Sequence, residues 1–125
     1  MAAQHRFSKR SETALAGVDA RLVAVARRAL KLSPVDFMVT EGRRSRERQA
    51  ALLKAGATRT MNSKHLTGHA IDVAAWVDGQ VRWDWPLYRL IAEAFKTAAA
   101  EQGVQITWGG DWRTFKDGPH FEVKA

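Results

Sequence analysis

The first clear pattern of apolar positions predicts an amphipathic helix between Asp19 and Ser33. Asp19 is a favourable N-cap, and Pro34 disfavours continuation of the helix beyond Ser33. The apolar residues recur at the 3.6-residue period of a helix. They are Leu22, Val25, Ala26, Ala29 and Leu30. We expect this stripe to pack against the core of the protein.

A longer helix is predicted after Asp84, which we expect to cap it. Pro86 lies in its first turn, where proline is tolerated, and Gly103 ends it. The expected buried stripe of this helix consists of Leu87, Leu90, Ile91, Ala94, Phe95 and Ala98.

Short apolar runs between these helices predict strands. Residues 35–40, 104–108 and 121–123 have the length and composition of buried strands. The Asp78-Gly79 pair predicts a tight hairpin turn, after which residues 80–83 return antiparallel. The pattern therefore predicts an α+β fold, with a small antiparallel sheet and packed helices, in a single domain over residues 1–125.

Residues 57–68 (ATRTMNSKHLTG) have no apolar period, which predicts a loop. They follow a shorter helix, predicted from a cap at Ser45 to about Ala55 and closed by Gly56. Long loops are uncommon in small domains unless they have a function. We therefore expect this segment to contribute to a functional site.

Composition restricts the available chemistry. The chain has no cysteine, so any bound metal must be held by His, Asp or Glu. The net charge of +7 favours an anionic partner, such as nucleic acid, a membrane surface or an acidic cell-wall polymer. The basic residues fall in several separate clusters, and solvation of helix surfaces explains any one of them equally well.

A carboxylate within an apolar strand is the first candidate for chemistry. Residues 69–75 (HAIDVAA) alternate as a strand does, with Asp72 on the face opposite Ile71 and Val73. A buried carboxylate is costly unless it is paired or bound to a cation. Two interpretations stay open: a salt bridge from Asp72 to an arginine, or a metal site that includes His65.

The segment 117–122 (DGPHFE) places a second histidine, His120, between two carboxylates. Two imidazoles and a carboxylate, with one position left for water, are typical of a catalytic zinc site. Asp117 lies three residues before His120, near enough to reach a bound water rather than the metal. Zinc lowers the pKa of such a water to roughly 7, and a nearby carboxylate can accept its proton.

Two separated motifs resemble those of a known peptidase family. Residues 63–72 (SKHLTGHAID) match S-x-H-x-x-G-x-A-x-D, and residues 117–122 match D-x-x-H-[FW]-E. Thr40–Ser45 (TEGRRS) resembles the family's E-G-x-R-[ST] turn. From about Phe7 to Lys124 the chain is thus similar to the zinc D-alanyl-D-alanine carboxypeptidase family with the hedgehog/DD-peptidase fold. That family includes vancomycin-resistance dipeptidases and phage L-alanyl-D-glutamate endopeptidases.

The resemblance implies a role for each matching residue. The implied zinc ligands are His65, Asp72 and His120. Asp117 is implied as the catalytic acid/base, and Arg44 as the residue that stabilises the developing oxyanion. A permanently charged, rigid guanidinium suits that role. The adjacent Arg43 is the alternative.

Weaker candidates for substrate binding or support of the ligands are Ser63, His69, Glu122 and Trp112. Ser63 either contacts metal or substrate or simply orders its loop. Glu122 either accepts the second N–H of a ligand imidazole or is a solvated charge. His69 is expected to support the ligands or to be structural. Trp112 and Phe115 are candidates to line a substrate groove, whereas we expect Trp108 to belong to the core.

The expected function is that of a peptidoglycan peptidase similar to phage endolysins, which cut the stem peptide between L-alanine and D-glutamate. Aspartate at position 117 and the segment WGGDW at 108–112 favour that branch. The alternative within the enzyme class is a D,D-carboxypeptidase or dipeptidase acting on D-Ala-D-Ala. From other classes, a non-catalytic binding module would not need the complete ligand set, and no nucleic-acid motif supports a specific nucleic-acid binder.

The remaining expectations concern location and assembly. No secretory signal or apolar run of the ~20 residues that span a bilayer is visible. We therefore expect a protein that accumulates in the host cytoplasm and reaches the wall through a holin. We also expect it to be a monomer. Its positive charge is expected to attract it to anionic polymers of the wall or to the outer-membrane surface.

Overall fold

The computed structural model describes residues 6–58, 61, 63–114 and 116–124. Its helices are α1 (Lys9–Leu15), α2 (Ala20–Leu32), α3 (Arg46–Lys54) and α4 (Trp85–Gln102), with short 3₁₀ helices η1 (Lys64–Thr67) and η2 (Gly109–Asp111). Its strands are β1 (Asp36–Glu41), β2 (Ala70–Val77), β3 (Gln80–Arg82), β4 (Ile106–Trp108) and β5 (His120–Val123). The structure confirms the predicted α+β class.

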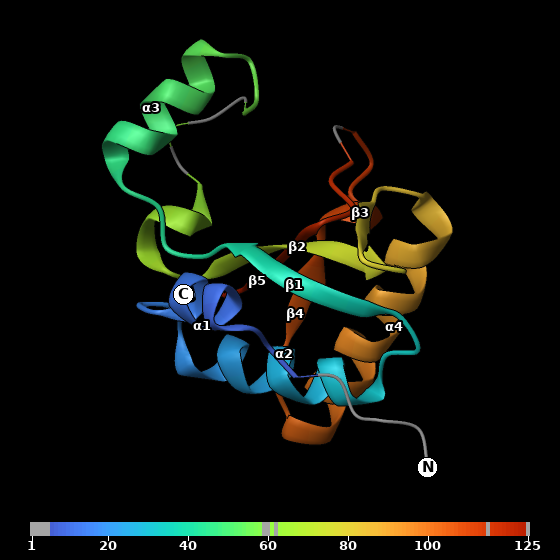
Figure 1. Cartoon of the computed structure of the whole chain (residues 1–125). Coiled ribbons are helices and arrows are strands. Elements are labelled where there is room, and N and C mark those ends of the chain that lie inside the picture. Colours follow the sequence, from blue (N-terminus) through green and yellow to red (C-terminus); the bar gives the residue numbers. More distant parts are fainter. Residues whose placement is uncertain (1–5, 59–60, 62, 115, 125) are drawn as a thin grey trace.

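The five strands form one antiparallel sheet with the order β1-β2-β5-β4, and β3 pairs with the distal part of β2. Figure 1 shows α1, α2 and α4 gathered on one side of this sheet, whereas α3 projects away from it. We call the face of the sheet that carries none of these three helices the open face.

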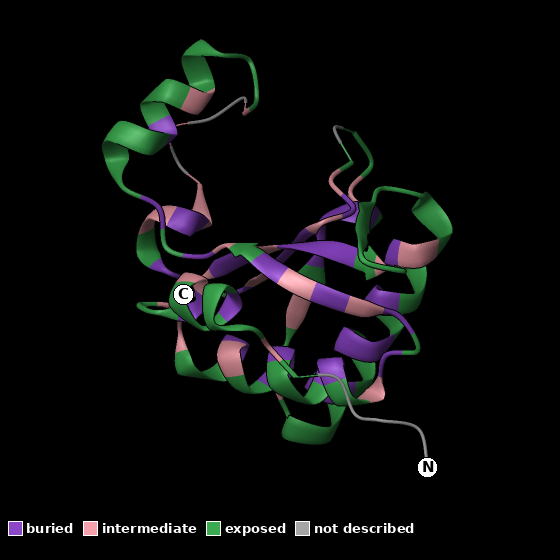
Figure 2. Ribbon diagram, viewed as in Figure 1, coloured by how far each residue is buried: buried purple, intermediate pink, exposed green. Residues whose placement is uncertain are grey.

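The core lies between the sheet and the three helices. Ile71, Val73 and Ala75 of β2 belong to it, as the predicted alternation requires. Phe121 of β5 stacks on Phe95 of α4, with ring centroids 3.8 Å apart and planes at 13°. Figure 2 shows the contrast with α3, which is largely exposed; within it only Gln49 is buried.

Most of the predicted elements are confirmed, with small shifts of their ends. The helix after Asp19, the hairpin at Asp78-Gly79 and the final strand all form. The strand predicted over residues 104–108 is shorter and starts at Ile106. Part of the predicted loop 57–68 is the 3₁₀ helix η1. No helix in the described part of the chain is both long and apolar enough to cross a membrane.

Two features of the helices differ from expectation. Helix α1 was not predicted, because it is mostly polar and buries only Ser11 and Leu15. Asp84 does occupy the N-cap of α4, but its carboxylate pairs with Arg82 instead of a helix N–H. Leu90, predicted to be buried, is 40% exposed, since it lies beside the stripe that meets the sheet.

Candidate active site

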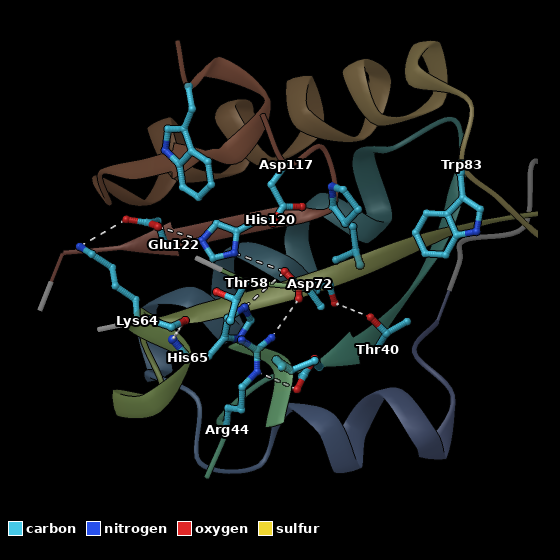
Figure 3. Close-up of a pocket in the computed structure, with 17 residues that line it drawn as sticks. Thr40, Arg44, Thr58, Lys64, His65, Asp72, Trp83, Asp117, His120 and Glu122 are labelled. Atoms are coloured by element: carbon cyan, nitrogen blue, oxygen red, sulfur yellow. Dashed lines mark hydrogen bonds and ion pairs between the residues drawn. The ribbon is translucent and has the colours of Figure 1, made fainter. Parts of the chain in front are cut away.

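The candidate ligands meet on the open face of the sheet. The antiparallel register of β2 and β5 places Asp72 directly opposite His120. The 3₁₀ helix η1, which Ser63 caps, brings the buried His65 to the same place. These residues line a cleft of about 520 Å³, shown in Figure 3, which Arg44 and Asp117 also line.

The three side chains are arranged as a compact cluster. His65 Nε2 and His120 Nδ1 each lie 3.3 Å from Asp72 Oδ1. One ligand atom from each of the three residues lies within 4.8 Å of the other two. The two imidazole rings are tilted by 70°, so their nitrogens approach the same point from different directions.

Each imidazole is held through its other nitrogen. Nδ1 of His65 lies 2.8 Å from the carbonyl oxygen of Gly42, and in the neutral imidazole a hydrogen bond donated from Nδ1 to this oxygen leaves Nε2 as an acceptor. Nε2 of His120 lies 2.8 Å from Oε1 of Glu122, as the interpretation of Glu122 as a supporting carboxylate requires. Such contacts orient metal-binding histidines and fix their tautomers.

The donor set fits a metal ion. Nε2 of His65 is buried, and apart from its 3.3 Å contact with Asp72 Oδ1 it has no partner among the described residues, which is unusual for a buried polar atom. Two imidazole nitrogens and one carboxylate oxygen are the ligand types that zinc prefers in catalytic sites. The cluster is therefore a candidate metal site; its composition does not by itself identify the metal.

The carboxylate of Asp72 serves both interpretations that the sequence left open. Its Oδ1 faces the two histidines, while its Oδ2 lies 3.4 Å from Nη2 of Arg44. Burial by itself would raise the pKa of Asp72, but the hydrogen bonds from His120 and His65 outweigh burial and keep that pKa well below its usual range. Asp72 is thus held in its charged form, the form that a metal ligand requires.

The pKa of His120 is shifted in the opposite direction. Burial would lower it, but the hydrogen bonds to Asp72 and Glu122 raise the pKa of His120 to about 9. The pKa of Glu122 is lowered, because its contacts with His120 outweigh the effect of its burial. The site therefore favours an ionised carboxylate on each side of this imidazole.

Asp117 occupies a different electrostatic environment. It lies between η2 and β5, where its backbone N–H donates to the carbonyl of Gly109 at 3.0 Å. A side chain at position 109 would collide with Asp117, since a Cβ there would lie 2.3 Å from its carbonyl oxygen. Burial and the nearby charge of Asp72 raise the pKa of Asp117. A raised pKa suits a carboxylate that takes up and releases a proton.

The structure also separates the two adjacent arginines. Arg44 is buried, and its Nε and Nη1 donate to Glu41 and Gln49, both at 2.8 Å. Arg43 is exposed and its side chain lies near Gly17. Only Arg44 of the pair lines the cleft.

The weaker candidates fall into different places. Ser63 lines the cleft and accepts a hydrogen bond from the N–H of His65 at 3.2 Å, which orders the 3₁₀ turn. Trp112 also lines the cleft, with its ring centroid 5.0 Å from that of His120. His69 is not brought into the cleft: its Nδ1 lies 2.6 Å from Thr67, and its Nε2 faces Asp19.

Of the two remaining aromatic candidates, only Trp108 lies in the described part of the chain. Trp108 belongs to the core, as expected, and its Nε1 donates to the carbonyl of Gly118 at 2.7 Å. Gly110 is required beside it, because a Cβ there would lie 2.3 Å from the indole ring. Phe115 lies outside the described residues.

Two residues, one beside the cleft and one lining it, were not singled out in the sequence. Gln49 is fully buried and connects Arg44 to Thr58, accepting from the first and donating to the second. Trp83 lines the cleft from the end of β3. A buried glutamine in an otherwise polar helix leaves no signal in the sequence, whereas an exposed tryptophan beside a hairpin could have been noticed.

Comparison with known proteins identifies relatives over almost the whole chain. The model of the phage L-alanyl-D-glutamate peptidase family matches residues 3–123. The chain is 38% identical over 123 residues to the L-alanyl-D-glutamate peptidase of Escherichia phage T5, an alignment that covers 95% of this chain and 89% of that protein. It is 35% identical to the peptidoglycan L-alanyl-D-glutamate endopeptidase CwlK of Bacillus subtilis, covering 71% of this chain and 61% of CwlK.

A solved structure agrees with these sequence matches. The crystal structure of the L-Ala D-Glu endopeptidase ChiX of Serratia marcescens superposes with a TM-score of 0.90 and 50% sequence identity. The superposition covers 97% of this chain and 91% of that one. The predicted family resemblance is confirmed, and the branch that it favoured is the one that matches. The chain belongs to the phage L-alanyl-D-glutamate peptidase family.

Proposed function

We propose that this protein is a zinc-dependent endopeptidase that hydrolyses the L-alanyl–D-glutamate bond of the peptidoglycan stem peptide. The observation that supports this most directly is the cluster of His65, Asp72 and His120 beside Asp117 in one cleft. The relatives named above are peptidases or endopeptidases of this bond, and membership of their family extends the substrate to this chain.

In this proposal His65, Asp72 and His120 would hold the ion. Zinc, when bound, supplies a Lewis acid that acidifies water and polarises a carbonyl. Asp117 accepts the proton of the attacking water and returns it to the leaving amine of D-glutamate. The surroundings that raise the pKa of Asp117 favour its uptake of that proton.

We assign two tasks to Arg44. Its contact with Asp72 balances a ligand charge, and its guanidinium provides positive charge where negative charge develops on the carbonyl oxygen. Hydrogen bonds to Glu41 and Gln49 restrain its position, so little reorganisation is needed during the reaction. Arginine suits this double role because its donors lie in a rigid planar group.

The wider biological setting is also a proposal. We propose a monomeric enzyme with the hedgehog/DD-peptidase fold, in which residues 1–125 act as one catalytic domain. Its net charge of +7 would attract it to anionic wall polymers or to the outer-membrane surface. We further propose that it reaches the wall from the host cytoplasm through a holin, which predicts host lysis only when a holin is co-expressed.

Chelation combined with product analysis tests the core of the proposal. Removing the metal should abolish digestion of purified peptidoglycan, and stoichiometric zinc should restore it. Mass spectrometry of the products should show stem peptides with a new N-terminal D-glutamate. Release of free D-alanine instead would establish the D,D-carboxypeptidase alternative, and digestion that survives chelation would refute the metal-dependent mechanism.

A further inference from the structure

A tryptophan that the metal site does not use lies at the far end of the same cleft. Trp83 is 61% exposed, the largest exposure of any large hydrophobic residue in the described part of the chain. Figure 3 shows it at one end of the cleft, with Lys64 and Glu122 at the other and Asp72 between them. An indole that is exposed and also lines a catalytic cleft is well placed to meet the substrate.

The position of this indole is restrained. Its ring lies parallel to that of Tyr88, at an interplanar angle of 3° with centroids 6.0 Å apart, which is an offset-stacked arrangement. Tyr88 is itself buried, and its hydroxyl accepts a hydrogen bond from Ala75 N–H and donates one to the carbonyl of Arg82. Because the Trp83 ring is already held in place, little side-chain conformational entropy is lost when a ligand stacks on it.

Two neighbouring side chains extend this surface. Trp76 and Val81 are paired across β2 and β3 and are 39% and 38% exposed. Trp76 lies four residues along β2 from Asp72, so it shares the open face of the sheet with that ligand. We call Trp76, Val81 and Trp83 the aromatic strip; of the three, Trp83 lines the cleft, and the paired Trp76 and Val81 lie farther along the hairpin.

The chemistry of the substrate indicates what this strip binds, if the proposed function is correct. In peptidoglycan the L-alanine of the stem is joined through a lactyl group to an N-acetylated sugar, so one residue separates the scissile bond from the glycan. The C–H groups on one face of a pyranose ring carry partial positive charge and pack well on the negative face of an indole. We propose that the aromatic strip is a glycan-binding subsite, in which Trp83 stacks on a sugar ring next to the bound stem.

Two matched substrates test this proposal. One is a stem tetrapeptide capped by the lactyl group alone, and the other is the same peptide attached to its disaccharide. Trp83→Ala should lower kcat/KM on the disaccharide substrate about tenfold more than on the sugar-free one, since loss of a central tryptophan contact is usually among the costliest in an interface. Trp83→Phe should restore part of the difference, because it keeps an aromatic face.

Trp85→Ala is the matched control. Trp85 is also an exposed indole, at 42%, but it does not line the cleft and instead contacts Trp108. Its replacement should leave the ratio of the two kcat/KM values unchanged. If Trp83→Ala lowers kcat/KM equally for both substrates, the strip contacts the peptide. If it lowers kcat/KM for neither substrate, the strip contacts no part of the substrate. Either result overturns the proposal.

A binding experiment separates this inference from the proposed activity. Titration of the zinc-loaded protein with chitotetraose, a sugar without a peptide, should shift the indole N–H resonance of Trp83 and not that of Trp85. A shift would support the subsite even if the wild-type protein cleaved neither peptide substrate, which would refute only the proposed function. An unchanged Trp83 resonance at millimolar sugar would refute the subsite even if both substrates were cleaved.

Discussion

The two faces of the sheet differ in what stabilises them, although they share the same strands. On β5, Phe121 and Val123 face the helices and are buried in the core, whereas His120 and Glu122, which alternate with them, face the cleft. The covered face is apolar and gains stability from packing and removal of surface from water. The open face contains charged groups that partial burial would disfavour without partners.

The pKa shifts show how the open face is stabilised. Burial alone would raise the pKa of Asp72 and lower that of His120, yet both shift the other way because the two groups are hydrogen-bonded to each other and to neighbours. Asp117 has no comparable hydrogen-bonded partner among the described residues, and burial together with the charge of Asp72 raises its pKa. One strand can thus serve both stability and chemistry because its side chains alternate between faces. Changes on the two faces should therefore have separable effects.

The largest separable effect is expected at Asp117. Asp117→Asn removes the carboxylate that we propose as proton acceptor but keeps the size of the side chain, so kcat should fall about 10²–10⁴-fold. Zinc content and unfolding midpoint should stay close to those of the wild type. Asp111→Asn is the control, since Asp111 is exposed and pairs with Lys96. A kcat within threefold of the wild type would exclude Asp117 as the acid/base.

On the covered face, a substitution should instead lower the free energy of unfolding. Phe121→Ala removes a fully buried ring that stacks on Phe95, and should lower the free energy of unfolding by about 3–5 kcal/mol. Urea denaturation of the zinc-free protein measures this without a contribution from metal binding. Leu53→Ala, on the exposed α3, should change it by less than about 0.5 kcal/mol. A similar loss for both variants would contradict the assignment of the core.

A smaller effect is expected where a carboxylate supports a ligand. Glu122→Gln keeps a hydrogen-bond acceptor near His120 but removes its charge, and should weaken zinc binding about 10–100-fold. Competition with a chromophoric chelator gives the dissociation constant. Glu101→Gln, which alters an exposed pair with Arg28, should leave it unchanged. Unaltered zinc affinity in Glu122→Gln would show that the contact with His120 does not tune the site.

The smallest effect is expected at Ser63, whose hydroxyl orders the turn that contains His65. Ser63→Ala should lower the free energy of unfolding by about 1 kcal/mol, as for loss of a helix cap. Ser63→Thr should retain most of the stabilisation, because its hydroxyl can make the same hydrogen bond. Thermal unfolding of the zinc-free wild type and the two variants measures these differences. If Ser63→Ala instead lowered kcat more than tenfold with stability intact, Ser63 would contact the substrate directly.

Much of the fold was predictable because it rests on local periodicity. The stripe of α2, the alternation of β2 and the Asp78-Gly79 turn each depend on neighbours a few residues apart. Helix α1 was missed because only Ser11 and Leu15 of it reach the core, and the exposure of Leu90 depends on which side of α4 the sheet covers.

The types of ligand were also determined by the sequence. A chain without cysteine leaves His, Asp and Glu to bind metal, and two motifs pointed to His65, Asp72, His120 and Asp117. The family that these motifs resemble is the family to which the chain belongs. The types of residue and their order along the chain suffice to identify the family, because a sequence motif does not depend on the exact position of each side chain.

Only the tertiary structure decided how these residues are used. The choice of Arg44 over Arg43, the exclusion of His69 from the cleft and the contact between Glu122 and His120 all depend on the direction of a side chain. Asp72 meets His120, 48 residues away, because the register of β2 with β5 places them opposite each other. That register results from packing of the whole sheet, which no local pattern contains.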